Sequence, residues 1–368
     1  MKKSTQLLSL ILALIHFFTI QCIDALHASW TVVGAGPTGI KAVGLILDSG
    51  VPANQIVWLD REFNVGRMGK HYKNVPVNGR VSQYIAFLNE CKIFREINSD
   101  ALNYLCNLPL DYAPDLKVIV DPLFDITKYL IKKVHVIKDE MVALDFHHDK
   151  WTIKTHKTKF SSDNVVLATG AHPRTLSYEG VPQIPLDIAL DKNTLAACIN
   201  EEDTVAVIGS GHSSILILKY LSELPVAQVI NFYNKPVVYP VPMRGGIAWK
   251  ETGLKGAAAE WAKTVLEVNP PENLLRLEST PELIEELLPQ CTKIIYAVGF
   301  ERNELPIING DRNLYENYDR SSGIISHRLY GVGIAFPQQQ TDPLGNTENL
   351  VGLPYLTFDA LKEALEDK

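Results

Sequence analysis

The chain has 368 residues, a length that allows two domains, each with its own buried core. Apolar residues make up 46% of it and charged residues 21%, and the formal net charge of −7 excludes a strongly basic chain of the kind that binds nucleic acid. None of its five cysteines forms a C-x-x-C pair, which excludes zinc-ligand spacing and a redox dithiol.

The N-terminal residues are typical of a leader rather than of a folded domain. Two lysines precede the apolar run 7–20, which is the arrangement of a secretory signal. The run is short for a membrane span, although an anchor extended to Leu26 stays open. Cleavage beside Ala25 or Ala28 would come directly before the first expected strand, which favours a removable leader. We therefore expect residues 1–28 to be a signal peptide or an N-terminal anchor. The protein would then be exported or membrane-associated, and it is cytoplasmic if the segment is not a functional leader.

A glycine-rich loop follows the first expected strand, Trp30–Val33. The loop reads Gly34-Ala35-Gly36-Pro37-Thr38-Gly39 and opens a helix whose apolar face ends near Ser49. A second apolar run, Gln55–Leu59, comes next and ends at Asp60. This order of strand, loop, helix and strand is the context in which G-x-G-x-x-G predicts dinucleotide binding.

The residue types in this loop suit a diphosphate. Gly34 allows the tight turn, Gly36 lets the backbone approach the ligand, and Gly39 lets helix and strand pack closely. The amides at the helix N-terminus, where Pro37 stands, then stabilise the anion. Asp60 is expected to accept hydrogen bonds from the ribose hydroxyls.

A second loop of the same kind, Gly209-Ser210-Gly211-His212-Ser213-Ser214, occurs much later in the chain. It stands between expected elements in the same order: a strand at 204–208, a helix at 215–224 and a strand at 228–232. Two such loops imply one resident dinucleotide and one visiting dinucleotide, such as a flavin beside a nicotinamide.

The second loop departs from the first at two positions. Gly209 and Gly211 keep their roles, but Ser214 replaces the third glycine, which is tolerable because serine is small. No acid follows the second strand, and Lys235 stands near the ribose position instead. A basic residue there favours the extra phosphate of NADP, whereas a solvated loop lysine is the alternative.

Between the two loops we expect an antiparallel meander of three strands at 134–146, 151–160 and 164–167. The meander ends in Ala168-Thr169-Gly170, which resembles a segment of flavoproteins with two dinucleotide-binding domains. That superfamily has the pyridine nucleotide-disulfide oxidoreductase-like fold. It includes glutathione-reductase-like enzymes, flavin-containing monooxygenases and N-hydroxylating monooxygenases. The resemblance implies that Thr169 and Gly170 lie against FAD. A related string at 294–300 marks the expected return of the chain.

The resemblance implies an α/β fold with two Rossmann-like dinucleotide-binding domains. The NAD(P) domain is inserted into a split FAD domain that carries the antiparallel meander. The expected boundaries are 29–175 and 294–368 for the two parts of the FAD domain and 176–293 for the NAD(P) domain. FAD and NAD(P)H are the implied cofactors, and the missing dithiol separates the chain from the disulfide reductases of the superfamily.

One stretch resembles the flavin-containing monooxygenases in particular. These enzymes carry Gly-Gly-x-Trp after the ribose acid, then a Tyr and, six residues later, an Asn beside the flavin. Tyr72 and Asn78 match that pair, and Gly66 matches the first glycine. Arg67 and Gly69 replace the second glycine and the tryptophan.

The match implies a catalytic role for Asn78, whose amide can both donate and accept hydrogen bonds at the flavin edge. The alternative is a turn residue that stabilises the N-terminus of the helix expected near Val81. Arg67, which takes the place of the second glycine, is expected to bind the cofactor.

Two further departures separate the chain from the monooxygenase pattern. The histidine of F-x-G-x-x-x-H is missing before the second loop. The C-terminal Gly-Asp, whose acid binds the ribityl chain, is also missing from 329–336. Gly333 remains there, so we expect FAD to be contacted by backbone at that point.

Four other residues are further candidates for the site. His71 is either a base near the flavin or a surface histidine. Arg244 is a candidate contact to a nicotinamide phosphate, because guanidinium groups bind phosphate well. Lys255 and Trp261 either line a ligand cleft or start and pack a helix.

The predicted function is an FAD-dependent, monooxygenase-like oxidoreductase, in which NAD(P)H transfers a hydride to the flavin and oxygen reoxidises it. One alternative is a quinone- or oxygen-reducing oxidoreductase. Another is a catalytically idle nucleotide-binding redox sensor. We expect a small-molecule substrate or acceptor as partner and no nucleic acid; the oligomeric state stays open.

Overall fold

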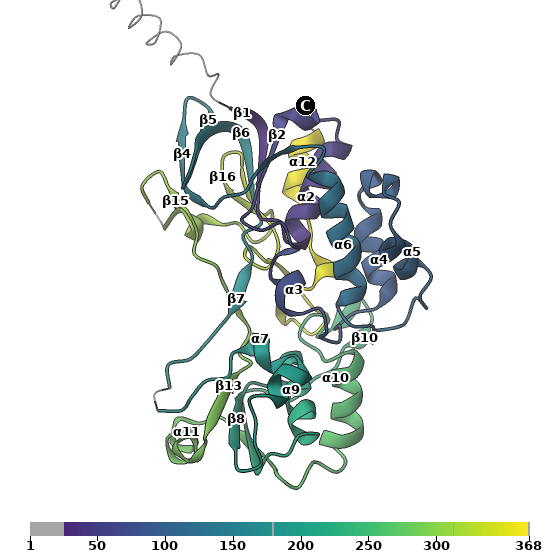
Figure 1. Cartoon of the computed structure of the whole chain (residues 1–368), viewed down its shortest axis with the longest axis vertical. Coiled ribbons are helices and arrows are strands. Elements are labelled where there is room, and N and C mark those ends of the chain that lie inside the picture. Colours follow the sequence, from purple (N-terminus) through teal and green to yellow (C-terminus); the bar gives the residue numbers. More distant parts are fainter. Residues whose placement is uncertain (1–25, 179, 312, 367–368) are drawn as a thin grey trace, which may run out of the picture.

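The computed structural model describes residues 26–366 except 179 and 312. It forms two α/β domains, the first in the upper half of Figure 1 and the second below it. Each domain has its own sheet, and the chain crosses between them twice.

The predicted leader or anchor lies almost entirely outside the described residues, so it stays a prediction. His27 and Ala28, however, already belong to the strand β1 (His27–Val33), where they pair with β6. The fold therefore begins before the predicted domain start at residue 29. Within the described part of the chain, no helix is long and apolar enough to cross a membrane.

The first domain is built on a sheet of nine strands. In spatial order, its strands are β15 (Ile307–Ile308), β4 (Met141–His147), β5 (Lys150–Thr155), β6 (Lys159–Leu167), β1, β2 (Ile56–Leu59) and β3 (His135–Ile137), with β17 (Leu329–Gly331) beside β6 and β16 (Ile324–Ser326) beside β17. Strands β3, β2, β1, β6 and β17 run parallel, whereas β4, β5 and β6 form the predicted antiparallel meander.

The meander strands have other boundaries than the sequence predicts. The expected strand 134–146 is two strands, because β3 joins the parallel part and β4 begins the meander. Asp139, between them, accepts hydrogen bonds from the amides of Glu140 and Lys157. The turn between the second and third meander strands lies at 156–158 rather than at the expected 161–163. In the observed turn, the hydroxyl of Thr155 accepts hydrogen bonds from the amides of Lys157 and Thr158.

Helices cover one face of this sheet, and the core is packed between them and the strands. They are α2 (Pro37–Asp48), α3 (Gly66–His71), α4 (Val81–Asn89), α5 (Asp100–Cys106), α6 (Lys117–Leu130) and α12 (Asp359–Glu366). Trp30 and Trp58 are completely buried in the sheet. Lys41 of α2 is also buried, with its Nζ 2.7 Å from Glu90 Oε1 and facing the ring of Phe358. Burial lowers the pKa of Lys41.

The second domain has a four-stranded parallel sheet. Its strands in spatial order are β12 (Leu274–Glu278), β9 (Gln228–Tyr233), β8 (Thr204–Ile208) and β13 (Lys293–Tyr296). The helices are α7 (Leu186–Ala189), α8 (Lys192–Ala196), α9 (His212–Ser222), α10 (Gly256–Trp261), which continues as a π-helical turn to Leu266, and α11 (Pro281–Leu287). Helix α11 covers one face and α9 and α10 the other.

The two crossing segments pair with each other as β7 (Ala171–Pro173) and β14 (Phe300–Arg302). Strand β13 pairs with β8 over its whole length. The predicted boundary at residue 294 falls inside this strand, which belongs to the second sheet rather than to the returning FAD domain. A pattern of apolar residues identifies a strand, but only pairing shows which sheet it joins.

Two hairpins lie outside the sheets. One is β10 (Val241–Met243) with β11 (Gly246–Ala248) in the second domain; the other is β18 (Gln338–Thr341) with β19 (Thr347–Leu350) in the C-terminal part of the first. Short 3-10 helices complete the fold: Ala53–Gln55, Lys92–Glu96, Leu288–Gln290, Asn313–Asn317 and Leu353–Tyr355.

The cysteines differ in burial. Cys91 and Cys291 are buried, and Cys198 is half-buried. Cys106 is exposed at the end of α5. All four are free thiols, and Cys22 lies outside the described residues.

Candidate cofactor sites

The first glycine loop crosses directly over the end of β6. Gly34 has φ +106°, and a Cβ there would overlap the carbonyl oxygen of Ala168. A Cβ on Gly39 would overlap the carbonyl oxygen of Gly34. Gly36, in contrast, has no atom within 4 Å of its Cβ position, so its backbone faces open space. Two glycines therefore pack the loop, and the middle one leaves room for a ligand.

Polar groups around this open space suit an anion and a ribose. No side chain caps α2 at Gly36, so its first amides are free for a diphosphate. Asp60 Oδ2 accepts the amide of Ala35 at 2.8 Å, and Asp60 Oδ1 accepts two further amides. These bonds orient the Asp60 carboxylate at the strand end, where the ribose hydroxyls are expected.

A cavity of about 430 Å³ lies over this loop. Gly34, Gly36, Pro37, Asp60 and Arg67 line it, as do Thr169 and Gly170, so the sequence predictions meet in one place. Thr169 Oγ1 is buried and has no hydrogen-bond partner among the described residues. We call a glycine loop with the uncapped helix N-terminus that follows it a cradle. The open first cradle, its free amides and the unpartnered hydroxyl of Thr169 fit FAD, and these residues would hold it.

The C-terminal contact to the first loop is made by Gly333. It has φ +80°, and a Cβ there would collide with Thr38 Oγ1. The next residue, Ile334, lines the cavity. Asn303, which the sequence analysis did not single out, also lines it and donates from Nδ2 to the carbonyl of Thr169 at 2.8 Å.

One wall of the cavity is tied to the second domain. Arg67 and Tyr72 line the cavity and donate hydrogen bonds to the carboxylate of Asp187 in α7, and His71 Nδ1 lies 3.7 Å from the same carboxylate. Burial, together with the bond to Asp187, raises the pKa of Tyr72. Arg67 therefore pairs with a carboxylate as well as facing the cofactor cavity, and His71 is part of this wall rather than an isolated surface histidine.

The second loop repeats the geometry of the first. Gly209 has φ +136°, and a Cβ there would overlap the carbonyl oxygen of Ala297, just as Gly34 meets Ala168. Gly211 has open space at its Cβ position, and no side chain caps α9. Ser214, in place of the third glycine, donates from Oγ to the carbonyl of Gly209 at 2.8 Å. Serine therefore replaces a close backbone contact with a hydrogen bond.

Asn231 stabilises the second loop by hydrogen bonds. It is completely buried in β9, and its Nδ2 donates to the carbonyls of Val207 and Gly209, each at 2.9 Å. Arg276 of β12 in turn donates from Nε to Asn231 Oδ1 at 3.0 Å. In the sequence, the signal that could have identified this role is that Asn231 is a polar residue between the apolar residues of its strand.

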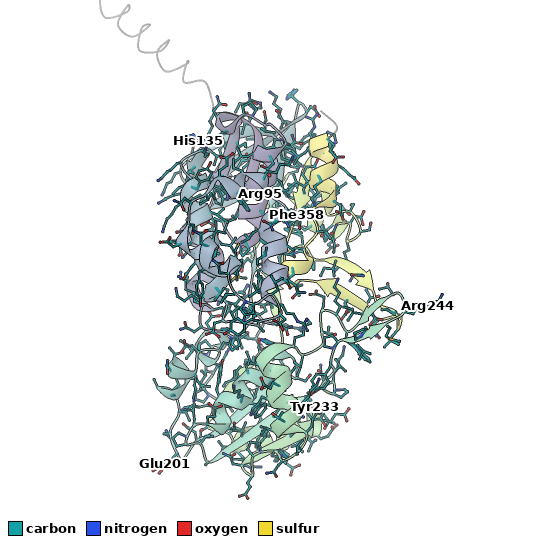
Figure 2. The ribbon with its side chains drawn as sticks, turned by 90° about the vertical axis from the view of Figure 1, so that its right-hand side faces the viewer. Arg95, His135, Glu201, Tyr233, Arg244 and Phe358 are labelled. Atoms are coloured by element: carbon teal, nitrogen blue, oxygen red, sulfur yellow. The ribbon has the colours of Figure 1, made fainter. Side chains whose placement is uncertain are left out.

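A second cavity of about 430 Å³ lies over this loop. Gly209, Gly211 and Asn234 line it, together with Arg174 from the crossing segment. Lys235 is exposed and does not line the cavity, so the structure does not place it at the ribose. Arg244 lies at the tip of the β10–β11 hairpin, where it points outward (Figure 2), and it is not among the residues that line this cavity.

Asn78 is not among the residues that line the first cavity. Its Oδ1 is buried and unpartnered among the described residues. Helix α4 begins at Val81 with Arg80 as its N-cap, and Gln83 Oε1 accepts the amide of Arg80. Asn78 therefore does not cap this helix, and its role beside the flavin stays a prediction.

His212, the first residue of α9, joins the second loop to the segment that precedes α4. Its Nε2 lies 3.1 Å from the carbonyl of Pro76, two residues before Asn78, and its Nδ1 is buried without a partner in the described part of the chain. Burial lowers the pKa of His212 to about 4, so the ring is neutral and Nε2 donates to Pro76.

The other two candidate residues, Lys255 and Trp261, lie at the start and end of α10. Lys255 precedes the helix, where Gly256 approaches the carbonyl of Val77, and Trp261 is buried in the core.

Residues 28–313 match the family described as pyridine nucleotide-disulphide oxidoreductase, which is well over half of the chain. The chain belongs to this family. Membership confirms the predicted superfamily and α/β fold, and with them an FAD-dependent oxidoreductase that uses NAD(P)H.

Proteins similar to this chain include monooxygenases and reductases. Monooxygenase AgnR1 of Paecilomyces divaricatus is 29% identical over 371 residues, covering 87% of this chain and 93% of that protein. A flavin-containing monooxygenase from Stenotrophomonas maltophilia has a TM-score of 0.57 at 14% identity, covering 93% of this chain and 98% of its own. A bacillithiol disulfide reductase from Staphylococcus aureus has a TM-score of 0.55 at 13% identity, covering 93% and 99%. At these identities, the two solved structures show a shared fold alone.

Proposed function

We propose that this oxidoreductase is monooxygenase-like and oxygenates a small-molecule substrate at the expense of NAD(P)H and oxygen. The observation that carries the proposal is the repeated cradle, in which a glycine loop crosses over Ala168 in one domain and over Ala297 in the other. One chain thus offers two equivalent diphosphate sites, and His212 brings the second to the segment that carries Asn78.

Each cradle has a defined part in this proposal. When bound, NAD(P)H supplies a hydride and FAD passes the electrons on to oxygen. The first loop and Asp60 orient one dinucleotide, and the second loop, supported by Asn231, orients the other. Asn78 offers a buried amide oxygen two residues after Pro76, which His212 contacts, and we assign it the polar contact at the reacting ring. Similarity to AgnR1, a protein named a monooxygenase, supports this choice over a reductase.

The test is anaerobic mixing of the purified, FAD-loaded protein with NADPH or NADH. We expect the yellow colour to bleach and to return when oxygen is admitted. Protein that stays yellow with both nicotinamides would contradict the proposal and support a redox sensor. Protein that cannot be loaded with FAD would contradict both.

The ratio of hydrogen peroxide formed to oxygen consumed then separates a monooxygenase from an oxidase. With a true substrate, we expect peroxide well below one equivalent of the oxygen used. Quantitative peroxide release with every substrate tried would favour the oxidase, and faster oxidation by quinones would favour a quinone reductase.

We propose further that the N-terminal segment directs export or membrane association. The support is its sequence pattern alone: lysines before the apolar run 7–20. Mass spectrometry of the mature N-terminus tests it, because a soluble chain that still begins at Met1 would contradict a cleaved leader.

A further inference from the structure

A second connection between the domains runs along the C-terminal wall of the first cavity. The chain after β9 leaves the second domain, forms the β10–β11 hairpin and returns at Lys255; we call residues 234–255 the bridging arm. Figure 2 shows its hairpin, marked by Arg244, extending toward the yellow C-terminal strands of the first domain. The hairpins are in contact, because a Cβ on Gly246 would lie 3.4 Å from Pro343.

Carboxylates from both domains hold this contact. Glu348, at the first domain's β19, accepts the amide of Thr252 at 3.0 Å, its hydroxyl at 2.6 Å and the amide of Glu251 at 3.3 Å. Asp342 accepts the amide of Trp249 at 3.2 Å. Trp249 has φ +52°, a conformation that a bulky residue keeps only when its surroundings hold it. Asp342 and Glu348 are only 8% and 6% exposed, so these charge-assisted bonds are shielded from water.

Two further hydrogen bonds have their acceptor on the arm and their donors in the first domain. Glu251 Oε2, on the arm, accepts the backbone amide of Gly352 at 2.9 Å and that of Val351 at 3.3 Å. These amides begin a segment of which Val351, Leu353 and Leu356 line the first cavity. The carboxylate of one domain thus fixes the wall of the cavity in the other.

The other end of the arm lies in the second cavity, which Asn234 lines. The arm therefore connects the two cofactor cavities through the chain itself. A dinucleotide bound against Asn234 would therefore contact the same segment that carries Glu251 to the wall of the first cavity.

We infer that Glu251 is a positioning residue for FAD: it holds the Val351–Leu356 wall from the second domain and so couples NAD(P) binding to FAD retention. The inference rests on the proposed function to the extent that the two cavities hold these two cofactors. Linkage makes the coupling reciprocal, so FAD also strengthens the binding of the nicotinamide.

The experiment measures FAD release from the full chain by the rise of free-flavin fluorescence after dilution, with and without NADP⁺, which cannot reduce the flavin. We expect NADP⁺ to slow release from the wild-type protein. Glu251→Ala is expected to release FAD about tenfold faster, the order of effect of losing a charge-assisted hydrogen bond. NADP⁺ is expected to have no effect on release from this variant.

Two further variants make the result specific. Glu251→Gln keeps an acceptor oxygen of the same reach but no charge, so we expect release between that of wild type and alanine. Glu260→Ala removes an exposed glutamate from α10 in the same domain and should behave as wild type. NADP⁺ affinity, measured by calorimetry without FAD, should be unchanged in all variants, since Glu251 lies outside the second cavity.

Each other outcome decides against the inference. If Glu251→Ala and Glu251→Gln retain FAD as wild type does, Glu251 does not position the wall. If release is faster but NADP⁺ still slows it by the wild-type factor, the coupling does not pass through Glu251. Wild-type protein that binds neither FAD nor NADP⁺ would overturn the proposed function together with this inference, whereas the first two outcomes overturn the inference alone.

Discussion

At the residue scale, His212 shows how one side chain takes a role that its motif does not require. It occupies a variable position of the second loop, yet its ring is buried against the Pro76 carbonyl of the other domain. A neutral imidazole suits this place, because a charged ring would lose hydration without gaining an anionic partner. The charge of Lys255 lowers the pKa further.

The pKa of His212 predicts a contribution to acid instability. The folded pKa is about 4 and the ordinary value 6.5, so below pH 6.5 the unfolded chain binds a proton that the folded chain does not. Stability therefore falls as the pH drops from 6.5 to 4. In urea titrations, His212→Gln should lose less stability over this range than wild type, although it is less stable at pH 7.5. Parallel pH profiles for the two proteins would contradict a neutral buried histidine.

At the element scale, the strand-to-helix corner is the unit that the chain uses twice. Each corner needs one glycine that packs against an alanine carbonyl and another that stays open. The first kind is required by the fold, and the second kind is required by the ligand. Gly36 and Gly211 have φ values of −74° and −83°, which alanine adopts without strain.

This difference predicts separable effects of substitution. Gly36→Ala should leave the ligand-free protein as stable as wild type but weaken FAD binding about 10- to 100-fold, because the methyl group occupies the approach of the diphosphate. Gly211→Ala should weaken NADPH binding similarly and leave FAD binding unchanged. Calorimetric unfolding and ligand titration measure both effects.

Gly34→Ala is the matched contrast, since its methyl group would overlap Ala168 at a φ of +106°. We expect it to lower the melting temperature even without ligand. A Gly36→Ala protein that binds FAD as wild type does would show that the loop does not contact the diphosphate.

At the scale of the whole molecule, polar groups on several sides hold the domains together. Asp187 binds Arg67 and Tyr72 on one side, and Asn74 donates to Asp191 nearby at 2.8 Å. The bridging arm makes the connection at the C-terminal hairpin, and His212 of the second loop contacts the Pro76 carbonyl of the first domain. Such polar interfaces are weaker than an apolar core, and their bonds keep the two cavities adjacent.

Loss of the Asp187 contact should loosen one side selectively. Asp187→Ala leaves Arg67 and Tyr72 without their acceptor at a half-buried site, so we expect a loss of about 1 kcal/mol. Hydrogen exchange should quicken at 66–74 and 186–191 but not in β1 or β8. Glu223→Gln, which removes the pair with Lys192 inside the second domain, is the control. Unchanged exchange at both segments in Asp187→Ala would show that this pair does not hold the domains.

Much of the fold was predictable because its signals are local. Both glycine loops, their flanking strands and helices, the meander and the crossing at Ala168 are encoded by short-range pattern and turn chemistry. Most of the predicted residues of the first site, from Gly34 to Gly170, meet at one cavity for the same reason. The sequence could not decide that β1 starts at His27 rather than Trp30, that residue 294 lies in a strand of the second sheet or that Lys235 lies outside the second cavity, because strand pairing and side-chain direction decide these points.

By itself, the sequence determined two dinucleotide cradles, since only glycine satisfies the close approaches that each corner makes and only a helix N-terminus leaves amides free for a diphosphate. The tertiary structure alone decided how the cradles are held together: by Asp187 at Arg67, by His212 at Pro76 and by Glu251 at the wall of the first cavity. These contacts join residues far apart in the chain, so their energies depend on the arrangement of both domains and leave no periodic pattern to read.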